Sequence, residues 1–180
     1  MAIDANPGGV LSAQEIRLRM AVEPPLVRGY PALDDQLQSN GFDLTLAEIH
    51  RHAGRGTIGV SNAERVLSTL EQISFDADGF ADLDTGIYHV TYNEIVALPL
   101  DVMALGRARS SLNRVGVTIH SAVWDAGYEG RSTSLLHVLN PEGFRVRRDA
   151  RILQLVFITL SLAAETGYAG IYQGENVAAV

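Results

Sequence analysis

The chain has 180 residues, of which 47% are apolar and 19% are charged, and its formal net charge is −7. This length and composition are ordinary for one globular domain. The acidic balance argues against a general nucleic-acid-binding protein, because such proteins usually carry a basic surface. The chain contains no cysteine, which excludes disulfide bonds and thiolate metal sites.

No segment of the sequence suggests export or membrane insertion. The N-terminus lacks the basic-then-apolar pattern of a signal peptide. The most apolar stretch, residues 152–164, is shorter than the roughly 20 residues that a membrane-spanning helix needs. The sequence therefore predicts a soluble, cytoplasmic protein that binds neither nucleic acid nor membrane.

One short helix is expected near the N-terminus. Ser12 and Glu15 have the spacing of a capping box, and Ile16 and Met20 follow as one apolar face. The Pro24-Pro25 pair should end any helix that begins there, since proline cannot continue the hydrogen-bond ladder.

Beyond residue 42 the dominant pattern is the alternation of apolar and polar residues that is typical of strands. Many short strands separated by turns favour an all-β sandwich or barrel. We expect one domain, residues 1–180, in which residues 165–180 form a C-terminal arm with too little apolar content to pack alone. The predicted strands are residues 44–49, 87–92, 117–123, 133–139 and 152–160.

Residues 54–59 have the GxGxxG spacing of a dinucleotide-binding loop, and Ser61 and Glu64 have the spacing of a second capping box. A dinucleotide fold requires strands that alternate with helices, whereas strand patterns dominate the remainder of this chain. A glycine-rich hairpin turn is the favoured interpretation.

Histidines offer a second, weaker pattern. His50 and His52 could supply two metal ligands from one strand, but the sequence places no suitable third ligand nearby, and a polar loop is the simpler account. His120 and His137 lie on predicted neighbouring strands and are expected to fill polar positions of a sheet face.

The most informative segment is the turn that begins at Asp125. An apolar strand ends in this one carboxylate, two glycines follow at 127 and 130, and Tyr128 stands three residues after the acid. This layout suits a hairpin that presents a flat ring and directs a general base toward a bound water. Taken alone, Asp-Ala-Gly is also good turn chemistry.

The segment Arg109–Arg114 is rich in donors for an anion. Arginine donates two parallel hydrogen bonds to phosphate oxygens, and serine hydroxyls with backbone N–H groups at a helix start add further donors. A capped helical turn with solvated arginines uses the same residue types, so this segment alone leaves both interpretations open.

Together these segments resemble the superfamily of dUTP nucleotidohydrolases (dUTPases) and dCTP deaminases. The resemblance covers nearly the whole chain, and it implies a mainly β, distorted barrel of the β-clip, jelly-roll-like kind with a short N-terminal helix. It also implies a homotrimer whose active sites are shared between subunits. The matching blocks are residues 11–16, 40–44, 86–88, 93–94, 98–99, 109–112, 124–130, 151–155 and 170–176.

One position indicates the branch of the superfamily. In the deaminases a catalytic glutamate stands ten residues after the aspartate of the turn, and here that position is Leu135. Leucine cannot shuttle the protons needed to expel ammonia from cytosine. The turn block and the Tyr-Gln-Gly-Glu-Asn tail look most like archaeal-type dUTPases, although the phenylalanine-bearing arm of common trimeric dUTPases is absent.

The resemblance implies hydrolysis of dUTP to dUMP and pyrophosphate, with Asp125 as the general base and uracil held by main-chain groups of residues 117–123 and 133–136. Mg²⁺ would be bound mainly by the triphosphate, and Asp43 would contact the ion through a water. Two alternatives stay open: a dCTP deaminase or dCTP-accepting hydrolase of the same scaffold, and a catalytically silent, nucleotide-binding regulatory trimer. The substrate-binding residues implied are Arg109, Ser110, Ser111, Arg114 and Gln154 for phosphates, Tyr128 for deoxyribose, and Tyr172 and Gln173 for closure by the arm.

Overall fold

The computed structural model describes residues 8–177; the first seven and last three residues of the predicted domain lie outside this range. The described chain is mainly β, as predicted. Its helical elements are α1 (Ala13–Met20), α2 (Leu33–Gln36), the 3-10 turn η1 (Asn62–Glu64) and α3 (Ser110–Arg114). Its strands are β1 (Gly9–Val10), β2 (Val27–Arg28), β3 (Leu37–Gln38), β4 (Gly41–Ala53), β5 (Thr69–Ile73), β6 (Phe80–Leu83), β7 (Gly86–Tyr92), β8 (Ile95–Ala97), β9 (Val102–Ala108), β10 (Val117–His120), β11 (Val123–Trp124), β12 (Glu129–Gly130), β13 (Thr133–Val138), β14 (Phe144–Arg147) and β15 (Arg151–Thr159).

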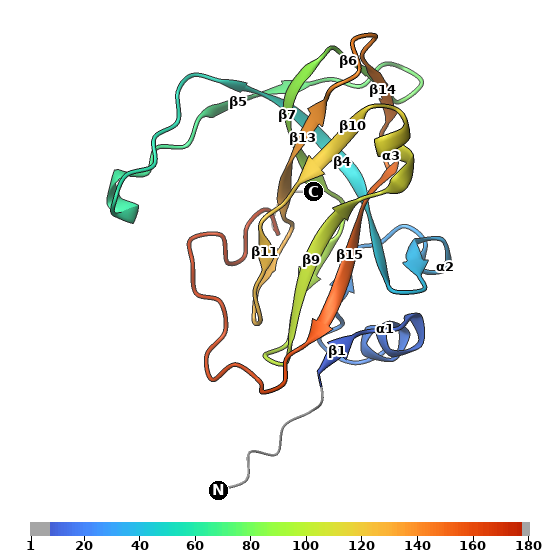
Figure 1. Cartoon of the computed structure of the whole chain (residues 1–180), viewed down its shortest axis with the longest axis vertical. Coiled ribbons are helices and arrows are strands. Elements are labelled where there is room, and N and C mark those ends of the chain that lie inside the picture. The colour runs from blue at the N-terminus through green and yellow to red at the C-terminus, as the bar shows by residue number, and fades with distance from the viewer. Residues whose placement is uncertain (1–7, 178–180) are drawn as a thin grey trace, which may run out of the picture.

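One large sheet frames the molecule, with its strands in the order β10-β13-β7-β4-β15-β9-β11 (Figure 1). The long strand β4 belongs to both halves of this sheet: its first part pairs with β15 and its second part with β7 and β5. The register shifts between Leu46 and Glu48, and such a bulge bends a strand. The sheet therefore curls on itself, which confirms the predicted distorted barrel.

The core fills the inside of this curl. Along β15, Leu153, Leu155 and Phe157 are fully buried while Gln154 and Val156 between them are half-exposed, the period of two that a strand imposes. Phe42 and Leu44 on β4 are likewise fully buried. No helix among residues 8–177 is long and apolar enough to cross a membrane.

Helix α1 begins where the capping box predicts. Ser12 Oγ accepts from the backbone N–H of Glu15, and the Glu15 carboxylate accepts from the backbone N–H of Ser12. Ile16 and Met20 are buried, so the predicted apolar face of the helix is confirmed.

A buried carboxylate ties the segment after α1 to the sheet. Glu94 is fully buried and accepts from Gln36 Nε2 at 2.7 Å, from Thr45 Oγ1 at 2.6 Å and from the Thr45 backbone N–H at 2.9 Å. Burial raises the pKa of the Glu94 carboxyl, and these hydrogen bonds oppose that rise.

The GxGxxG segment is a hairpin excursion, as predicted. Strands β4 and β5 pair directly up to Ala53 and Thr69, and residues 54–68 leave the body between them. The second capping box exists, with Ser61 N–H donating to Glu64, but it starts only the three-residue turn η1. The described part of the chain has no dinucleotide-type helix after this loop.

One strand prediction is wrong, and β9 is among the strands that the sequence does not predict. The stretch 117–123 is not one strand, because residues 121–122 separate β10 from β11. Strand β9 lacks a sequence signal because Ala104, Gly106 and Ala108 occupy its inward positions. A Cβ atom at Gly106 would lie 2.9 Å from the ring of Trp124, so this glycine makes room for the indole.

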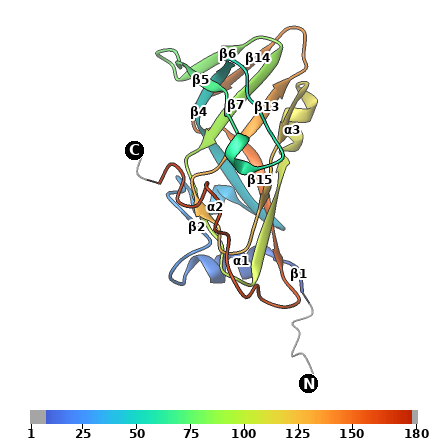
Figure 2. The ribbon, with the colours of Figure 1, turned by 90° about the vertical axis from the view of Figure 1, so that its left-hand side faces the viewer.

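The C-terminal segment runs back along the body on the same side as the hairpin excursion (Figure 2). It is held by backbone hydrogen bonds to residues 126–131, among them Tyr168 N–H to Ala126 O, Gly174 N–H to Glu129 O and Arg131 N–H to Glu175 O. The described part of this segment, residues 165–177, is therefore ordered against the turn of its own chain.

Candidate active site

A cavity of about 630 Å³ lies between the Asp125 turn, the sheet, the base of the hairpin excursion and the C-terminal segment. Two segments that are distant in sequence, 67–70 and 168–176, both reach it. The lining residues are His52, Leu67, Ser68, Leu70, His89, Ala122, Val123, Trp124, Asp125, Tyr128, Ser132, Thr133, Tyr168, Tyr172, Glu175 and Asn176.

Asp125 stands at the wall of this cavity, directly after β11, and its side chain is exposed. The turn closes through Tyr128 N–H donating to Asp125 O at 3.1 Å, with Gly127 at a φ of 80° that favours glycine. The neighbouring indole of Trp124 is buried and donates to Ser132 Oγ at 2.9 Å. The turn is thus anchored behind an exposed carboxylate at the cavity wall.

Tyr128 forms one wall of the cavity and is buried. Its hydroxyl donates to Glu175 Oε1 at 2.8 Å, and the ring of Tyr168 meets it edge-on with centroids 5.7 Å apart. Burial, followed by the hydrogen bond to Glu175, raises the pKa of the Tyr128 phenol well above its ordinary value. The phenol is therefore neutral and donates at physiological pH.

The C-terminal segment supplies Tyr172 to the cavity. The guanidinium of Arg65, from the hairpin excursion, lies 5.8 Å from the centroid of the Tyr172 ring, and Arg65 Nη1 lies 3.4 Å from its hydroxyl. Gln173 does not line the cavity: its amide donates to Gly127 O at 3.0 Å and accepts from Glu129 N–H at 3.1 Å. In this chain Gln173 holds the segment to the turn.

The predicted phosphate ligands gather elsewhere. Ser110 and Ser111 begin the five-residue helix α3 and are exposed, and Arg114 at its end donates to Ser110 O at 3.1 Å. Arg109 precedes the helix without any side-chain cap. The two serine hydroxyls and the Arg114 guanidinium therefore face solvent, where a ligand from outside the chain can meet them.

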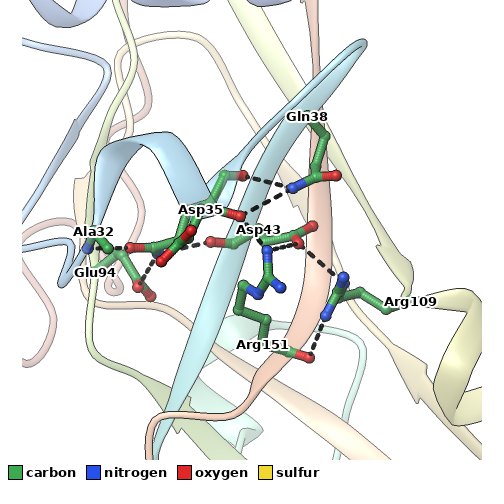
Figure 3. Close-up of polar contacts among 8 residues, drawn as sticks. Ala32, Asp35, Gln38, Asp43, Glu94, Arg109 and Arg151 are labelled. Carbon is green, nitrogen blue, oxygen red and sulfur yellow. Dashed lines mark hydrogen bonds and ion pairs between the residues drawn. The ribbon is translucent and has the colours of Figure 1, made fainter.

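Arg109 is oriented by a buried acid on β4, which lies on the far side of β15 from β9 (Figure 3). Asp43 Oδ2 lies 2.9 Å from Arg109 Nε and 3.6 Å from Arg151 Nη1, and the Asp43 side chain is fully buried. Burial raises the pKa of the Asp43 carboxyl, and the two guanidinium groups oppose that rise. Gln154 is the register partner of Asp43 on β15, which brings it to the same cluster.

The structure thus divides the predicted site residues into two groups. Asp125, Tyr128 and Tyr172 line the cavity. Gln173 lies beside the cavity without lining it. Farther away, around α3 and the β4–β15 pair, lie Asp43, Arg109, Ser110, Ser111, Arg114 and Gln154.

Leu135 lies on β13 directly opposite His89 on β7 and His120 on β10. No carboxylate stands in these register positions. The deaminase resemblance expects a glutamate at position 135. Neither this position nor its register partners on the two adjacent strands carry an acid.

The sequence does not indicate a binding role for several cavity residues, among them His89, Tyr168 and Glu175, and it offers His52 only as a metal ligand. His89 is half-buried, and its burial beside His52 and His50 lowers its pKa to about 4. The rings of His52 and His50 meet that of His89 edge-on, at centroid distances of 5.7 Å and 6.3 Å. Within residues 8–177, no group of three or more histidines and acids has a metal-binding arrangement.

Comparisons with known proteins agree with these observations. The family model for dCTP deaminase-like proteins matches residues 10–160. A Methanosarcina mazei protein named probable deoxyuridine 5'-triphosphate nucleotidohydrolase is 45% identical over 167 residues, 93% of this chain and 98% of that protein. The Methanocaldococcus jannaschii deoxyuridine 5'-triphosphate nucleotidohydrolase is 37% identical over 143 residues, 79% of this chain and 90% of that one.

A solved structure shares the fold. It is the 2'-deoxycytidine 5'-triphosphate deaminase from Agrobacterium tumefaciens, with a TM-score of 0.62 at 23% identity. The match covers 86% of this chain and 49% of the deaminase chain, so the present chain spans about half the length of that protein.

Proposed function

Because this chain belongs to the dCTP deaminase-like family, whose model matches residues 10–160, we propose that it is a dUTP diphosphatase that hydrolyses dUTP to dUMP and pyrophosphate. Relatives at about 45% identity along nearly the whole chain are named for this activity. The observation that carries the proposal is the exposed Asp125 at a cavity beside Tyr128, combined with leucine at position 135.

Asp125 would act as the general base. Its carboxylate takes a proton from a water that attacks the α-phosphorus in line, and pyrophosphate leaves from the opposite side. The cations of Arg109 and Arg114 would offset the negative charge that develops on the leaving group. Both arginines lie outside the cavity of their own chain, so this role calls for a site completed by a second subunit.

Uracil would pair with main-chain groups beside β10 and β13. Strand β10 is the last strand of the large sheet, so among the described residues one side of its main chain has no strand partner. Residues 121–122, where the strand breaks, stand outside the strand pairing of residues 8–177, and Ala122 lines the cavity. Tyr128 would lie against the deoxyribose.

Mg²⁺ would be bound chiefly by the triphosphate and would neutralise part of its charge. Direct coordination by Asp43 does not fit, because two guanidinium groups already face its carboxylate. Contact through a water fits better: Asp43 Oδ1 is buried and has no hydrogen-bond partner among the described residues.

The deciding experiment measures the fate of the nucleotide. Purified protein is incubated with dUTP, dCTP or dTTP, and pyrophosphate and ammonia are measured in parallel. We expect pyrophosphate from dUTP and no ammonia from dCTP. Ammonia release would support a deaminase of the same scaffold, and nucleotide binding without either product would support a silent regulatory protein.

We also propose a homotrimer with shared active sites, as the family resemblance implies, and a cytoplasmic location. The support for sharing is the separation of the phosphate ligands from the cavity within one chain.

A further inference from the structure

The hydroxyl of Tyr128 is bound by a residue of the C-terminal segment. Tyr128 Oη donates to Glu175 Oε1 at 2.8 Å, and both residues line the cavity. Glu175 is 47 positions further along the chain, so the contact exists only when the segment is docked.

The backbone leaves room for this pair at Gly130. A Cβ atom at that position would lie 2.5 Å from Tyr128 Oη and 3.2 Å from Glu175 Cγ. Real Cβ atoms do not approach other atoms at the shorter of these distances, so any other residue at 130 would push the hydroxyl and the carboxylate apart.

The position of Glu175 is set by backbone bonds on both sides. Arg131 N–H donates to Glu175 O at 2.9 Å, and Gly174 N–H donates to Glu129 O at 2.8 Å. Arg131 Nη1 donates to the next carbonyl, that of Asn176, at 2.8 Å. The carboxylate is therefore presented to Tyr128 by a fixed main chain.

The ring of Tyr128 is restrained on a second side as well. Tyr168, from the same segment, meets it edge-on at a centroid distance of 5.7 Å and an interplanar angle of 67°. With the hydroxyl held by Glu175, the ring can neither swing out of the cavity wall nor tilt away from a bound sugar.

We propose that Glu175 is a positioning residue which holds Tyr128 against the sugar, so that the docked C-terminal segment enforces the choice of deoxyribose over ribose. The proposal rests on the proposed function. A 2'-hydroxyl pressed onto a fixed ring loses its water and finds no hydrogen-bond partner. A ring freed from Glu175 can shift and admit the ribose, which weakens discrimination against UTP.

The test is a double-mutant cycle on the ratio of kcat/KM for dUTP to that for UTP. Glu175→Ala and Tyr128→Phe should each lower this ratio by about 3- to 10-fold, the range that one hydrogen bond contributes. The double variant should lose no more than Tyr128→Phe alone, because both changes remove the same contact. Additive losses, or an unchanged ratio in folded Tyr128→Phe, would overturn the proposal.

Two further variants separate positioning from simple damage to the segment. Glu175→Gln keeps an acceptor oxygen and should restore most of the wild-type ratio. Glu165→Ala removes an exposed carboxylate from the same segment, outside the cavity, and should leave the ratio unchanged. A loss in Glu165→Ala equal to that in Glu175→Ala would contradict the assignment.

The dissociation constants of non-hydrolysable α,β-imido analogues of dUTP and UTP are measured by calorimetry for the wild type and the same three variants of the cycle. Failure of the wild type to hydrolyse dUTP would refute the proposed function. The ratio of the two dissociation constants would still decide whether Glu175 acts through Tyr128.

Discussion

At the scale of single residues, the site depends on which side chains are exposed and which are buried and held by partners. Asp125 has an exposed carboxylate on a turn that is anchored from behind by Trp124. Asp43, in contrast, is fully buried and faces two guanidinium groups. The two acids are thus in opposite settings: Asp43 orients Arg109, whereas Asp125 is open to the cavity, as the proposed proton transfer requires.

Replacing Asp125 by asparagine should nearly abolish dUTP hydrolysis while nucleotide binding and folding persist. The amide cannot accept a proton from water, and loss of a general base typically lowers the rate by about 10²- to 10⁴-fold. The measurement is kcat from pyrophosphate release. The control is Asp78→Asn, in the exposed turn between β5 and β6, which should retain full activity. If Asp125→Asn hydrolyses dUTP at a rate within a few-fold of wild type, Asp125 is not the general base.

Glu94→Gln should destabilise the fold, although it changes only one atom. Both carboxylate oxygens accept hydrogen bonds, so one side of the amide must turn an N–H toward a donor, either Gln36 or Thr45. A buried donor or acceptor left unsatisfied costs about 1–3 kcal/mol.

Urea unfolding measures this cost as a loss in the free energy of unfolding. The control is Glu71→Gln on β5, where the side chain is exposed and a change within about 0.5 kcal/mol is expected. Equal stability of Glu94→Gln and wild type would show that the network contributes little.

At the scale of elements, one face of the sheet collects histidines from separate strands. His50 and His52 on β4 flank His89 on β7, and the pairing of His50 with His89 in register brings the rings together. This is a property of strand pairing, because the two strands lie in different parts of the sequence.

This cluster predicts a loss of stability in mild acid. The pKa of His89 is about 4 in the folded protein and 6.5 by its ordinary value, so the unfolded chain binds the proton more tightly. The contribution of His89 to the free energy of unfolding is therefore complete above its ordinary pKa of 6.5. This contribution is lost as the pH falls toward 4.

The measurement is the free energy of unfolding at about pH 7 and about pH 5 for wild type and His89→Gln, two values on either side of the ordinary histidine pKa. The difference between the two pH values should be smaller in the variant. Ile87→Gln, on the same face of β7 and without a titratable group, should keep the wild-type difference; equal behaviour of the two variants would count against the effect.

At the scale of the whole molecule, the cavity and the proposed phosphate-binding residues lie in different parts of one fold. The cavity is closed by two excursions from the sheet, residues 54–68 and the C-terminal segment, which lie on one side of the body (Figure 2). Helix α3 and the Asp43 cluster lie outside it.

Shared sites predict complementation between two inactive variants. Asp125→Asn and Arg114→Ala should each be nearly inactive alone, yet mixed trimers formed by co-refolding should regain part of the activity, because some sites receive both intact groups. Light scattering should give three times the 19.4 kDa mass of one chain. No recovery on mixing, or an active monomer, would contradict shared sites.

Much of this protein is predictable from local patterns in its sequence. The capping box of Ser12 and Glu15 forms the helix α1, and period-two alternation locates β7, β13 and β15 to within a residue or two. The turn after Asp125 follows from turn chemistry. These features depend on residues within a few positions of one another, whereas the roles of Asp125 and Tyr128 and the significance of Leu135 come from the family resemblance.

The tertiary structure alone decided which distant residues meet. Tyr128 bonds to Glu175 of the C-terminal segment, and His52 and His89 from two strands line the same cavity. Arg109 pairs instead with Asp43, outside the cavity. Each of these arrangements brings together residues from different strands or segments. Strand β9 has no clear sequence signal for the same reason, since its Gly106 is fitted to the indole of Trp124. Periodicity and caps record only local energetics, whereas these contacts depend on how the sheet curls and where the chain returns to it.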